Sequence, residues 1–284
     1  MNILKTKNLY YLGPEGSYAQ SAMHCFVDDL NICAENLIPL KPITKILQTI
    51  DENPDDMAVL PIENSIEGIV RETIDNLIKI NNKSINISAE TVIPIKHCLV
   101  SQSNNISDIT NILSHPQALG QCSEYICKHF QGVNIIETSS TSEAAKIAKQ
   151  KGNQYAAIAS ELTAGIYNLN ILKKEINDEK DNKTRFILLS NKNNNDVNDN
   201  KTSIFFTVIN EPGSLVNVLN IFHKYNINLL YIESRPSKKK MGEYNFYVDI
   251  DGNINDKNIN AAINLTERIT KKLIILGSYP KFKK

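Results

Sequence analysis

A hydroxyl and a guanidinium stand side by side at Thr184 and Arg185, within the polar first half of the segment 181–190. The apolar run that follows, 186–189, predicts a short buried strand, so both polar groups would lie where that strand begins. A hydroxyl beside a guanidinium at a strand end could bind a small anionic substrate. Because Thr and Arg also begin ordinary surface strands, the pair indicates a site only in combination with other loops.

A carboxylate, an amide and a hydroxyl stand together at Glu63, Asn64 and Ser65. They follow the nearly continuous apolar run 57–60, typical of a strand buried in a parallel sheet, and precede a helix expected from about 69 to 80. In open α/β sheets, ligands bind in the crevice at the carboxyl ends of the strands. The alternative is a polar turn with Asn64 or Ser65 as a helix cap. We favour a site, because one cap does not need three polar groups.

Four loops between a strand and a helix carry a Ser or Thr where the helix is expected to start. Helix N-termini attract anions, because free N–H groups and the helix dipole both point outward. Each cap alone is better explained as structural, whereas several caps facing one cleft would favour a small, multiply anionic ligand. The four are Ser17, Ser65, Ser114 and the pair Ser140 and Thr141; His115, next to Ser114, is read as a turn residue or a ligand contact.

The composition is that of an ordinary globular protein, with 31 basic and 31 acidic residues among 284. This length fits about two domains, and the balanced charge gives no general attraction to nucleic acid or to an anionic membrane. No apolar run approaches the ~20 residues of a membrane span. Five cysteines without a CxxC pair, and a start without a signal-peptide core, predict reduced thiols in a cytoplasmic protein. We expect neither metal nor cofactor, since zinc spacing and Walker or GxGxxG loops are missing.

The chain is expected to form two lobes, a linker and a compact C-terminal unit. Strand–helix units before about residue 80 and after about 85, with the Thr184 strand returning, predict two lobes with a cleft between them. Residues 191–201 are almost entirely Asn, Asp and Lys, too polar to bury anything, and predict a linker. Beyond it, strands and helices are expected in the order βαββαβ, the ferredoxin-like arrangement, with the first strand at 202–209.

Several short blocks resemble prephenate dehydratases, in that family's order, and two more resemble the ACT regulatory domain that follows in the family. The first set is Gly13-Pro-x-Gly-Ser-Tyr, Pro61-Ile-Glu-Asn-Ser-x-Glu-Gly68, Ser114-His-Pro-Gln-Ala-Leu, Gln121-Cys122, Ser140-Thr141 with Ala144-Ala145, and Asn182-x-Thr-Arg-Phe186. The second set is Gly213-Ser-Leu-x-x-x-Leu219 and Glu233-Ser-Arg-Pro236. The blocks are specific in combination, and together they cover nearly the whole chain.

The resemblance implies an α/β fold in which a two-lobed, periplasmic-binding-protein-like catalytic domain at 1–190 precedes a ferredoxin-like ACT domain at 202–284. It implies decarboxylating dehydration of prephenate to phenylpyruvate, regulated by L-phenylalanine. The family's separate chorismate mutase domain would need a further upstream segment, so we expect a monofunctional enzyme. Ferredoxin-like units have an exposed sheet edge and commonly pair with a copy of themselves, which predicts a homodimer or homotetramer.

The resemblance also implies roles for individual residues. Thr184 is the essential hydroxyl, and the implied catalytic group is Thr184, Glu63, Asn64 and Ser114. The implied substrate contacts are Ser17, Ser65, His115, Gln117, Ser140, Thr141, Arg185 and Phe186. The implied effector contacts are Gly213, Ser214, Leu215, Glu233, Ser234 and Arg235, with Gly213 allowing a ligand to approach the backbone closely.

Two other functions are open at this point. One is arogenate dehydratase, which would use the same machinery on a substrate with an amino group in its side chain. The other is a non-catalytic amino-acid sensor on the same two-lobed fold. An intact Asn-x-Thr-Arg-Phe block argues against the sensor, because a protein that only binds has no need of that hydroxyl.

Overall fold

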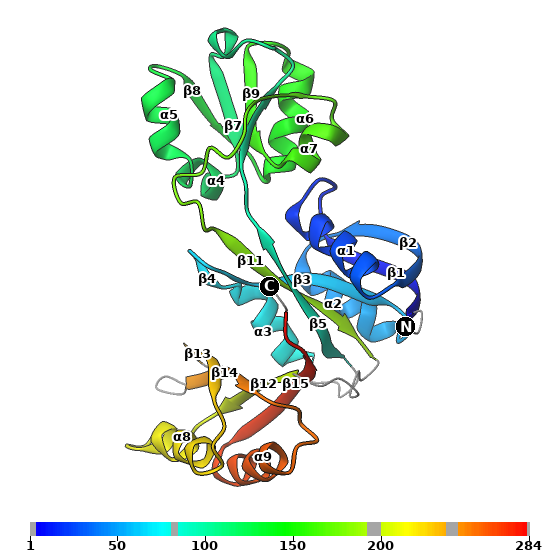
Figure 1. Ribbon diagram of the computed structural model, residues 1–284, viewed down its shortest axis with the longest axis vertical. Coiled ribbons are helices and arrows are strands. Elements are labelled where there is room, and N and C mark those ends of the chain that lie inside the picture. The colour runs from blue at the N-terminus through cyan, green and yellow to red at the C-terminus, as the bar shows by residue number, and fades with distance from the viewer. Residues whose placement is uncertain (1–3, 81–84, 192–199, 237–243, 283–284) are drawn as a thin grey trace.

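The structure is a computed structural model that describes residues 4–80, 85–191, 200–236 and 244–282. The predicted linker, 191–201, falls mostly on residues 192–199, which lie outside the described part. Three sheets follow one another along the long axis of the molecule (Figure 1). None of the helices in the described ranges has the length and apolar character needed to cross a membrane.

The first lobe is a six-stranded sheet with the order β2-β1-β3-β11-β5, and β4 pairs with β3. One face packs on α1 and the other on α2 and α3, which is why the runs 57–60 and 186–189 are apolar on both sides. The elements are β1 (Leu4–Leu12), α1 (Tyr18–Asp29), β2 (Ile32–Leu40), α2 (Ile43–Glu52), β3 (Met57–Asn64), β4 (Gly68–Ile69), α3 (Arg71–Lys79), β5 (Asn86–Pro94) and β11 (Lys183–Ser190).

The second lobe is a five-stranded sheet with the order β10-β6-β9-β7-β8. The chain enters it after β5 and returns through β11, so two crossings, 95–97 and 174–182, connect the lobes (Figure 1). Its elements are β6 (Cys98–Ser101), η1 (Ile106–Asp108), β7 (Asn111–Ser114), α4 (Pro116–Gly120), α5 (Ser123–His129), β8 (Asn134–Glu137), α6 (Thr141–Lys151), β9 (Tyr155–Ala159), α7 (Glu161–Ile166) and β10 (Asn170–Lys173).

The C-terminal unit has the predicted order βαββαβ, in a four-stranded sheet ordered β13-β14-β12-β15. Its elements are β12 (Asn200–Thr207), α8 (Ser214–Lys224), β13 (Leu229–Pro236), β14 (Tyr244–Asp251), α9 (Lys257–Ile269) and β15 (Lys272–Pro280). The first strand begins at Asn200, two residues before the predicted start. Lys201, expected in the polar linker, is instead buried, because its ammonium lies 2.6 Å from Glu90.

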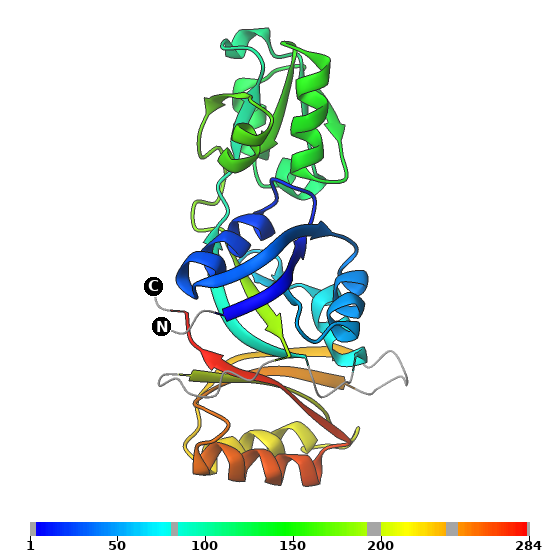
Figure 2. The ribbon, with the colours of Figure 1, turned by 90° about the vertical axis from the view of Figure 1, so that its right-hand side faces the viewer.

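The C-terminal sheet carries α8 and α9 on its outer face and lies with its other face on the first lobe (Figure 2). Phe205, Tyr247 and Tyr279 of this sheet belong to the same hydrophobic core as α2 and α3. At the contact, a Cβ on Gly277 would lie 2.3 Å from the carbonyl oxygen of Ile87 in β5. The two backbones therefore approach this closely only because Gly277 has no side chain.

Candidate active site

A cavity of about 340 Å³ lies between the two lobes. Residues from both lobes and from one crossing line it, as expected for a ligand site at a lobe boundary. The first lobe contributes Tyr18, Pro61, Asn64, Val70 and Thr184, the crossing contributes Ile95 and His97, and the second lobe contributes His115, Gln117, Ala118, Gln121, Ser139, Ser140 and Thr141.

Thr184 and Asn64 meet at this cavity because β11 and β3 pair with these two residues opposite each other. Asn64 Nδ2 donates a hydrogen bond of 2.9 Å to Thr184 Oγ1. Asn64 Oδ1 accepts from the backbone N–H groups of Ile66 and Glu67, both at 3.0 Å, which fixes the orientation of the amide. Because Thr184 Oγ1 accepts this hydrogen bond, the hydroxyl proton of Thr184 is free to be donated to a ligand in the cavity.

A chain of side-chain hydrogen bonds continues from Asn64 across the crossing segments. Asn64 Nδ2 also donates to Asn182 Oδ1 at 2.8 Å, and Asn182 Nδ2 donates to Gln121 Oε1 at 3.0 Å. Gln121 Oε1 also lies 3.1 Å from His97 Nε2. The chain therefore joins Thr184 of the first lobe to Gln121 of the second through groups that are mostly buried.

His97 is nearly enclosed, with an exposed fraction of 3%. Burial lowers the pKa of its imidazole, and the hydrogen bond to Gln121 opposes this to a smaller extent, so the ring is neutral near pH 7. Its Nδ1 lies 3.3 Å from the Tyr18 hydroxyl, which donates to the carbonyl oxygen of Lys96 at 2.8 Å. Burial raises the pKa of Tyr18, so this hydroxyl keeps its proton.

Two helix starts form the second-lobe wall of the cavity. Ser140 caps α6 by accepting from the N–H of Glu143 at 3.1 Å, as predicted. The Glu143 carboxylate in turn accepts from the N–H of Ser139 at 3.1 Å, and hydrogen bonds from Ser139 lower the pKa of Glu143. His115 caps α4, with its Nδ1 accepting from the N–H of Gln117 at 3.3 Å. The positive ends of both helices thus border the cavity.

Ser114 and Glu63, predicted in the catalytic group, do not line the cavity. Ser114 is fully buried and donates to the carbonyl oxygen of Ile158 at 2.7 Å, and the helix cap expected of it is His115. Glu63 precedes Asn64 on β3, so its side chain leaves the opposite face of the sheet. Its carboxylate lies 3.0 Å from Arg185 Nε. In this structure both side chains have protein partners away from the cavity.

Three predicted substrate contacts also have structural partners instead. Ser17 caps α1 and donates to the carbonyl oxygen of Leu12 at 2.8 Å. Ser65 does not cap a helix; its Oγ accepts from the N–H of Lys183 at 2.9 Å and so extends the contact between β3 and β11. Phe186 is buried in the core under α1.

The block that contains Ser17 also contacts the second lobe. Gly16 has a φ of 85°, and its carbonyl oxygen accepts from Thr163 Oγ1 of the second lobe at 2.7 Å. A Cβ on Gly16 would lie 3.0 Å from both Thr163 Oγ1 and Ser142 Oγ. The second glycine of the block is therefore required by its φ angle and by the close contact between lobes.

Arg185, predicted as a substrate contact, does not line the cavity, and its guanidinium pairs with carboxylates elsewhere. Its Nη1 lies 2.6 Å from Asp249 of the C-terminal sheet and 3.3 Å from Glu90 of β5. Lys201 completes this buried cluster at 2.6 Å from Glu90, and Ser203 donates to Asp249 at 2.5 Å. The guanidinium therefore connects the first lobe to the C-terminal unit.

The charges in this cluster stabilise each other. Burial alone would raise the pKa of Asp249, but Arg185 and Lys201 outweigh it and hold that pKa below its usual value. Burial alone would lower the pKa of Arg185, and its neighbours, Asp249 and Glu90 among them, raise it instead. Removing one partner from such a set leaves an uncompensated buried charge.

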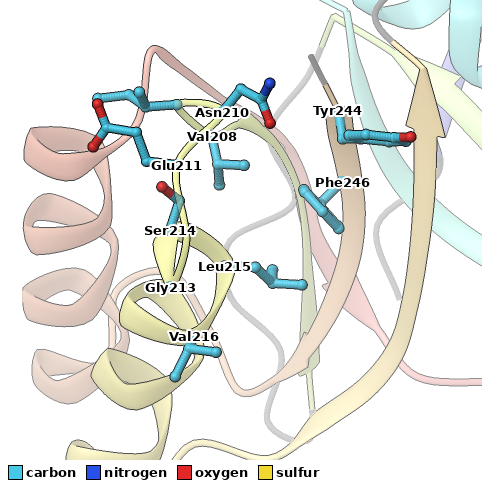
Figure 3. Close-up of a pocket in the computed structure, with 10 residues that line it drawn as sticks. Val208, Asn210, Glu211, Gly213, Ser214, Leu215, Val216, Tyr244 and Phe246 are labelled. Carbon is cyan, nitrogen blue, oxygen red and sulfur yellow. The ribbon is translucent and has the colours of Figure 1, made fainter. Parts of the chain in front are cut away.

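A second hollow, of about 210 Å³, lies at the start of α8 in the C-terminal unit. The predicted effector contacts Gly213, Ser214 and Leu215 line it, and Figure 3 shows Leu215 on one side with Tyr244 and Phe246 of β14 on the other. The remaining predicted contacts, Glu233, Ser234 and Arg235, do not line this hollow. Arg235 is buried and pairs with Asp75 of α3 at 3.2 Å, so it holds β13 against the first lobe.

Five polar residues of the site were not predicted as site residues: Tyr18, His97, Gln121, Ser139 and Asn182. Tyr18, Gln121 and Asn182 stood in blocks that resemble the family, which was the available signal for all three. His97 carries no local signal, because it reaches the site only through contacts between distant segments. Within the described ranges, no three His, Cys, Asp or Glu side chains are gathered where they could hold a metal ion.

Comparison with known proteins identifies the family of the chain. The family described as "Prephenate dehydratase" matches residues 9–194, and the family described as "ACT domain" matches residues 202–264. The chain is 39% identical over 280 residues to the prephenate dehydratase of Methanocaldococcus jannaschii, covering 97% of this chain and 99% of that one. It is 36% identical over 281 residues to the bifunctional chorismate mutase/prephenate dehydratase of Aquifex aeolicus, covering 99% and 75%.

Among solved structures, prephenate dehydratase from Arthrobacter aurescens in complex with L-Phe superposes with a TM-score of 0.85 at 30% identity, covering 96% of this chain and 90% of that one. The predicted fold is therefore confirmed. The chain belongs to the prephenate dehydratase family of lyases, with an ACT domain after the catalytic one.

Proposed function

We propose that the cavity between the lobes binds prephenate, and that Thr184 protonates the departing ring hydroxyl while the ring carboxylate leaves as carbon dioxide. The observation that carries the proposal is the hydrogen bond from Asn64 Nδ2 to Thr184 Oγ1. Because the threonine oxygen accepts here, its own proton is free to be donated to the substrate. A protein that only binds an amino acid gains nothing from this arrangement.

The charge balance of the reaction requires a proton donor. Prephenate carries two carboxylates, whereas phenylpyruvate carries one, so each turnover consumes one proton together with the departing hydroxide. Thr184 gives its proton to that oxygen, and water leaves. Asn64 Nδ2 stabilises the negative charge that develops on Thr184 Oγ1, and solvent then restores the proton. Because a threonine hydroxyl is a weak acid, orientation and a preorganised, nearly dry site supply most of the rate enhancement.

The two carboxylates of prephenate need different surroundings. The carboxylate that remains suits the first turn of α6 near Ser140 and Thr141, because the first N–H groups of a helix have no partner within it. The carboxylate that is lost suits the apolar side of the cavity, where Pro61, Val70 and Ile95 provide poor solvation for its charge.

The test is to add prephenate to the purified protein and follow phenylpyruvate, with arogenate as a parallel substrate. Faster turnover of prephenate is expected, because amides, hydroxyls and neutral imidazole at the cavity suit a keto acid. Faster turnover of arogenate would establish the alternative dehydratase. Failure to convert either substrate would favour the sensor and refute the proposal.

We further propose that L-phenylalanine binds the hollow at Gly213, Ser214 and Leu215, where two copies of the ACT domain pair in a homodimer or homotetramer. Support comes from β13, an edge strand on which Leu230 and Ile232 are each 42% exposed. Light scattering with and without phenylalanine tests the assembly, and a monomer at assay concentration would contradict it.

A cytoplasmic location is part of the same proposal, supported by five cysteines that are all free thiols.

A further inference from the structure

His97 has no part in the mechanism above, although its ring borders the cavity and ends the hydrogen-bond chain that begins at Thr184. It lies in the crossing between β5 and β6, where the backbone is held by Asn177, whose side-chain oxygen accepts from the N–H of His97 at 2.6 Å. His97 is thus held by hydrogen bonds at both its backbone and its ring.

The direction of every bond in the chain follows from the backbone contacts of Asn64. Because Asn64 Oδ1 accepts from two backbone N–H groups, the atom facing Asn182 and Thr184 is a donor. The Asn182 atom at 2.8 Å must then be the acceptor Oδ1, which leaves Nδ2 to donate to Gln121. Gln121 Oε1 therefore accepts, and the His97 nitrogen at 3.1 Å from it must carry a proton.

Without a donor at His97, the Gln121 amide has a second possible orientation. Gln121 Nε2 is buried and has no hydrogen-bond partner among the described residues, so little holds it in place. If the Gln121 amide rotated, its Nε2 would point at Asn182, and the Asn182 amide would have to rotate as well to accept from it. Asn182 Nδ2 would then face Asn64 Nδ2, so two donors would stand opposite each other. When His97 Nε2 carries a proton, rotation of the Gln121 amide would place Gln121 Nε2 against the His97 Nε2–H, so the rotated state is disfavoured.

We propose that His97 is a positioning residue for the dehydration: its Nε2–H donates to Gln121 Oε1 and thereby fixes the bond directions that leave the Thr184 proton facing the substrate. The neutral ring then carries no proton on Nδ1, so Nδ1 does not donate to the Tyr18 hydroxyl 3.3 Å away, and that hydroxyl donates to the carbonyl oxygen of Lys96 instead. This inference rests on the proposed function of Thr184.

The test compares His97→Gln with His97→Asn in the full-length protein with prephenate. Both variants carry an amide, but only the glutamine can place a donor where His97 Nε2 lies. His97→Gln should keep kcat within about threefold of wild type, and His97→Asn should lower it about tenfold or more, which corresponds to the loss of one hydrogen bond. KM should change less than kcat in His97→Asn, and thermal unfolding midpoints of the two variants should match.

A second comparison separates positioning from direct contact with substrate. In an Asn182→Ala background the chain is already broken, so adding His97→Asn should lower kcat by no more than about twofold. An equal loss in both backgrounds, equal kcat for the Gln and Asn variants, or wild-type kcat for His97→Asn would each overturn the inference. A wild-type protein without turnover of prephenate would overturn the proposed function, and the inference with it.

Discussion

Thr184 and Arg185 are neighbours on β11, and their side chains leave opposite faces of the sheet. Thr184 lines the cavity between the lobes, whereas Arg185 lies 2.6 Å from Asp249 in the ACT domain. Neighbouring residues on a strand alternate between faces, so this division follows from the strand itself. One strand therefore carries the proposed proton donor and also a link to the regulatory domain.

Asn64→Asp should lower kcat while leaving the fold intact. One oxygen of the new carboxylate can still accept from the N–H groups of Ile66 and Glu67, but the other can no longer donate to Thr184. The threonine hydroxyl would then donate to that carboxylate and withdraw its proton from the substrate. We expect kcat to fall about 100-fold, in the range found for loss of one preorganised donor.

The matched control for this variant is Asn36→Asp, since Asn36 is an exposed amide on β2 away from the cavity. It should leave kcat unchanged. Near-wild-type kcat for Asn64→Asp, with prephenate saturating, would mean that the direction of the bond to Thr184 does not matter.

Much of the fold could be predicted because its signals are local. The apolar runs 57–60 and 186–189 are buried strands. Ser17 caps α1 and Ser140 caps α6, the helices that were expected to begin directly after these two serines. The cap at α4 was misplaced by one residue, because His115 can accept from a backbone N–H as Ser114 can. The cap expected at Ser65 is absent, because α3 begins only at Arg71.

The site was harder to predict because its membership depends on which face each side chain occupies. Thr184 and Asn64 were predicted together and do share the cavity, whereas Arg185 and Glu63 stand beside them in sequence and face the ACT domain. Strand alternation predicts that neighbours separate, but the choice of face depends on Asp249, a partner in another domain. His97 joins the site through folding of the crossing segment, which local patterns do not reveal.

Asp249→Ala should destabilise the protein strongly, because it leaves Arg185 buried without its closest carboxylate. Breaking such a buried pair costs about 3–5 kcal/mol, measurable as the free energy of unfolding in denaturant.

The same cluster predicts a pH dependence. The free energy of unfolding of the wild-type protein should fall as pH drops below about 3.9, the unfolded pKa of Asp, because the folded pKa of Asp249 is lower. Asp249→Asn, which still faces Arg185 and Lys201, should lack that part of the decline. An Asp249→Ala protein as stable as wild type would contradict the assignment of the cluster.

Gly277→Ala should loosen the contact between the ACT domain and the first lobe. The added Cβ would lie 2.3 Å from the Ile87 carbonyl oxygen, a backbone atom that cannot rotate away. We expect a loss of about 1–3 kcal/mol in unfolding free energy. Gly165→Ala, in α7 with open space around its Cβ position, is the control and should be neutral or slightly stabilising. Equal stability of the two variants would show that the sheets are not held at this distance.

Leu215→Ala should weaken the response to phenylalanine without changing basal kcat. Leu215 lines the hollow at the start of α8, and loss of apolar contact there should reduce effector affinity about tenfold. The measurement is the shift of thermal midpoint against phenylalanine concentration, together with inhibition of turnover. Ile269→Ala, an exposed position at the end of α9, is the control. An unchanged phenylalanine response in Leu215→Ala would place the effector elsewhere.

The most direct test of the account is kcat for prephenate in wild type, Thr184→Ser and Thr184→Ala, with thermal midpoints recorded for all three. The serine variant keeps a hydroxyl beside Asn64 and should stay within about tenfold of wild type, whereas the alanine variant should lose at least about 100-fold. If folded Thr184→Ala turned over prephenate at close to the wild-type rate, Thr184 would not be the proton donor and the account would be wrong.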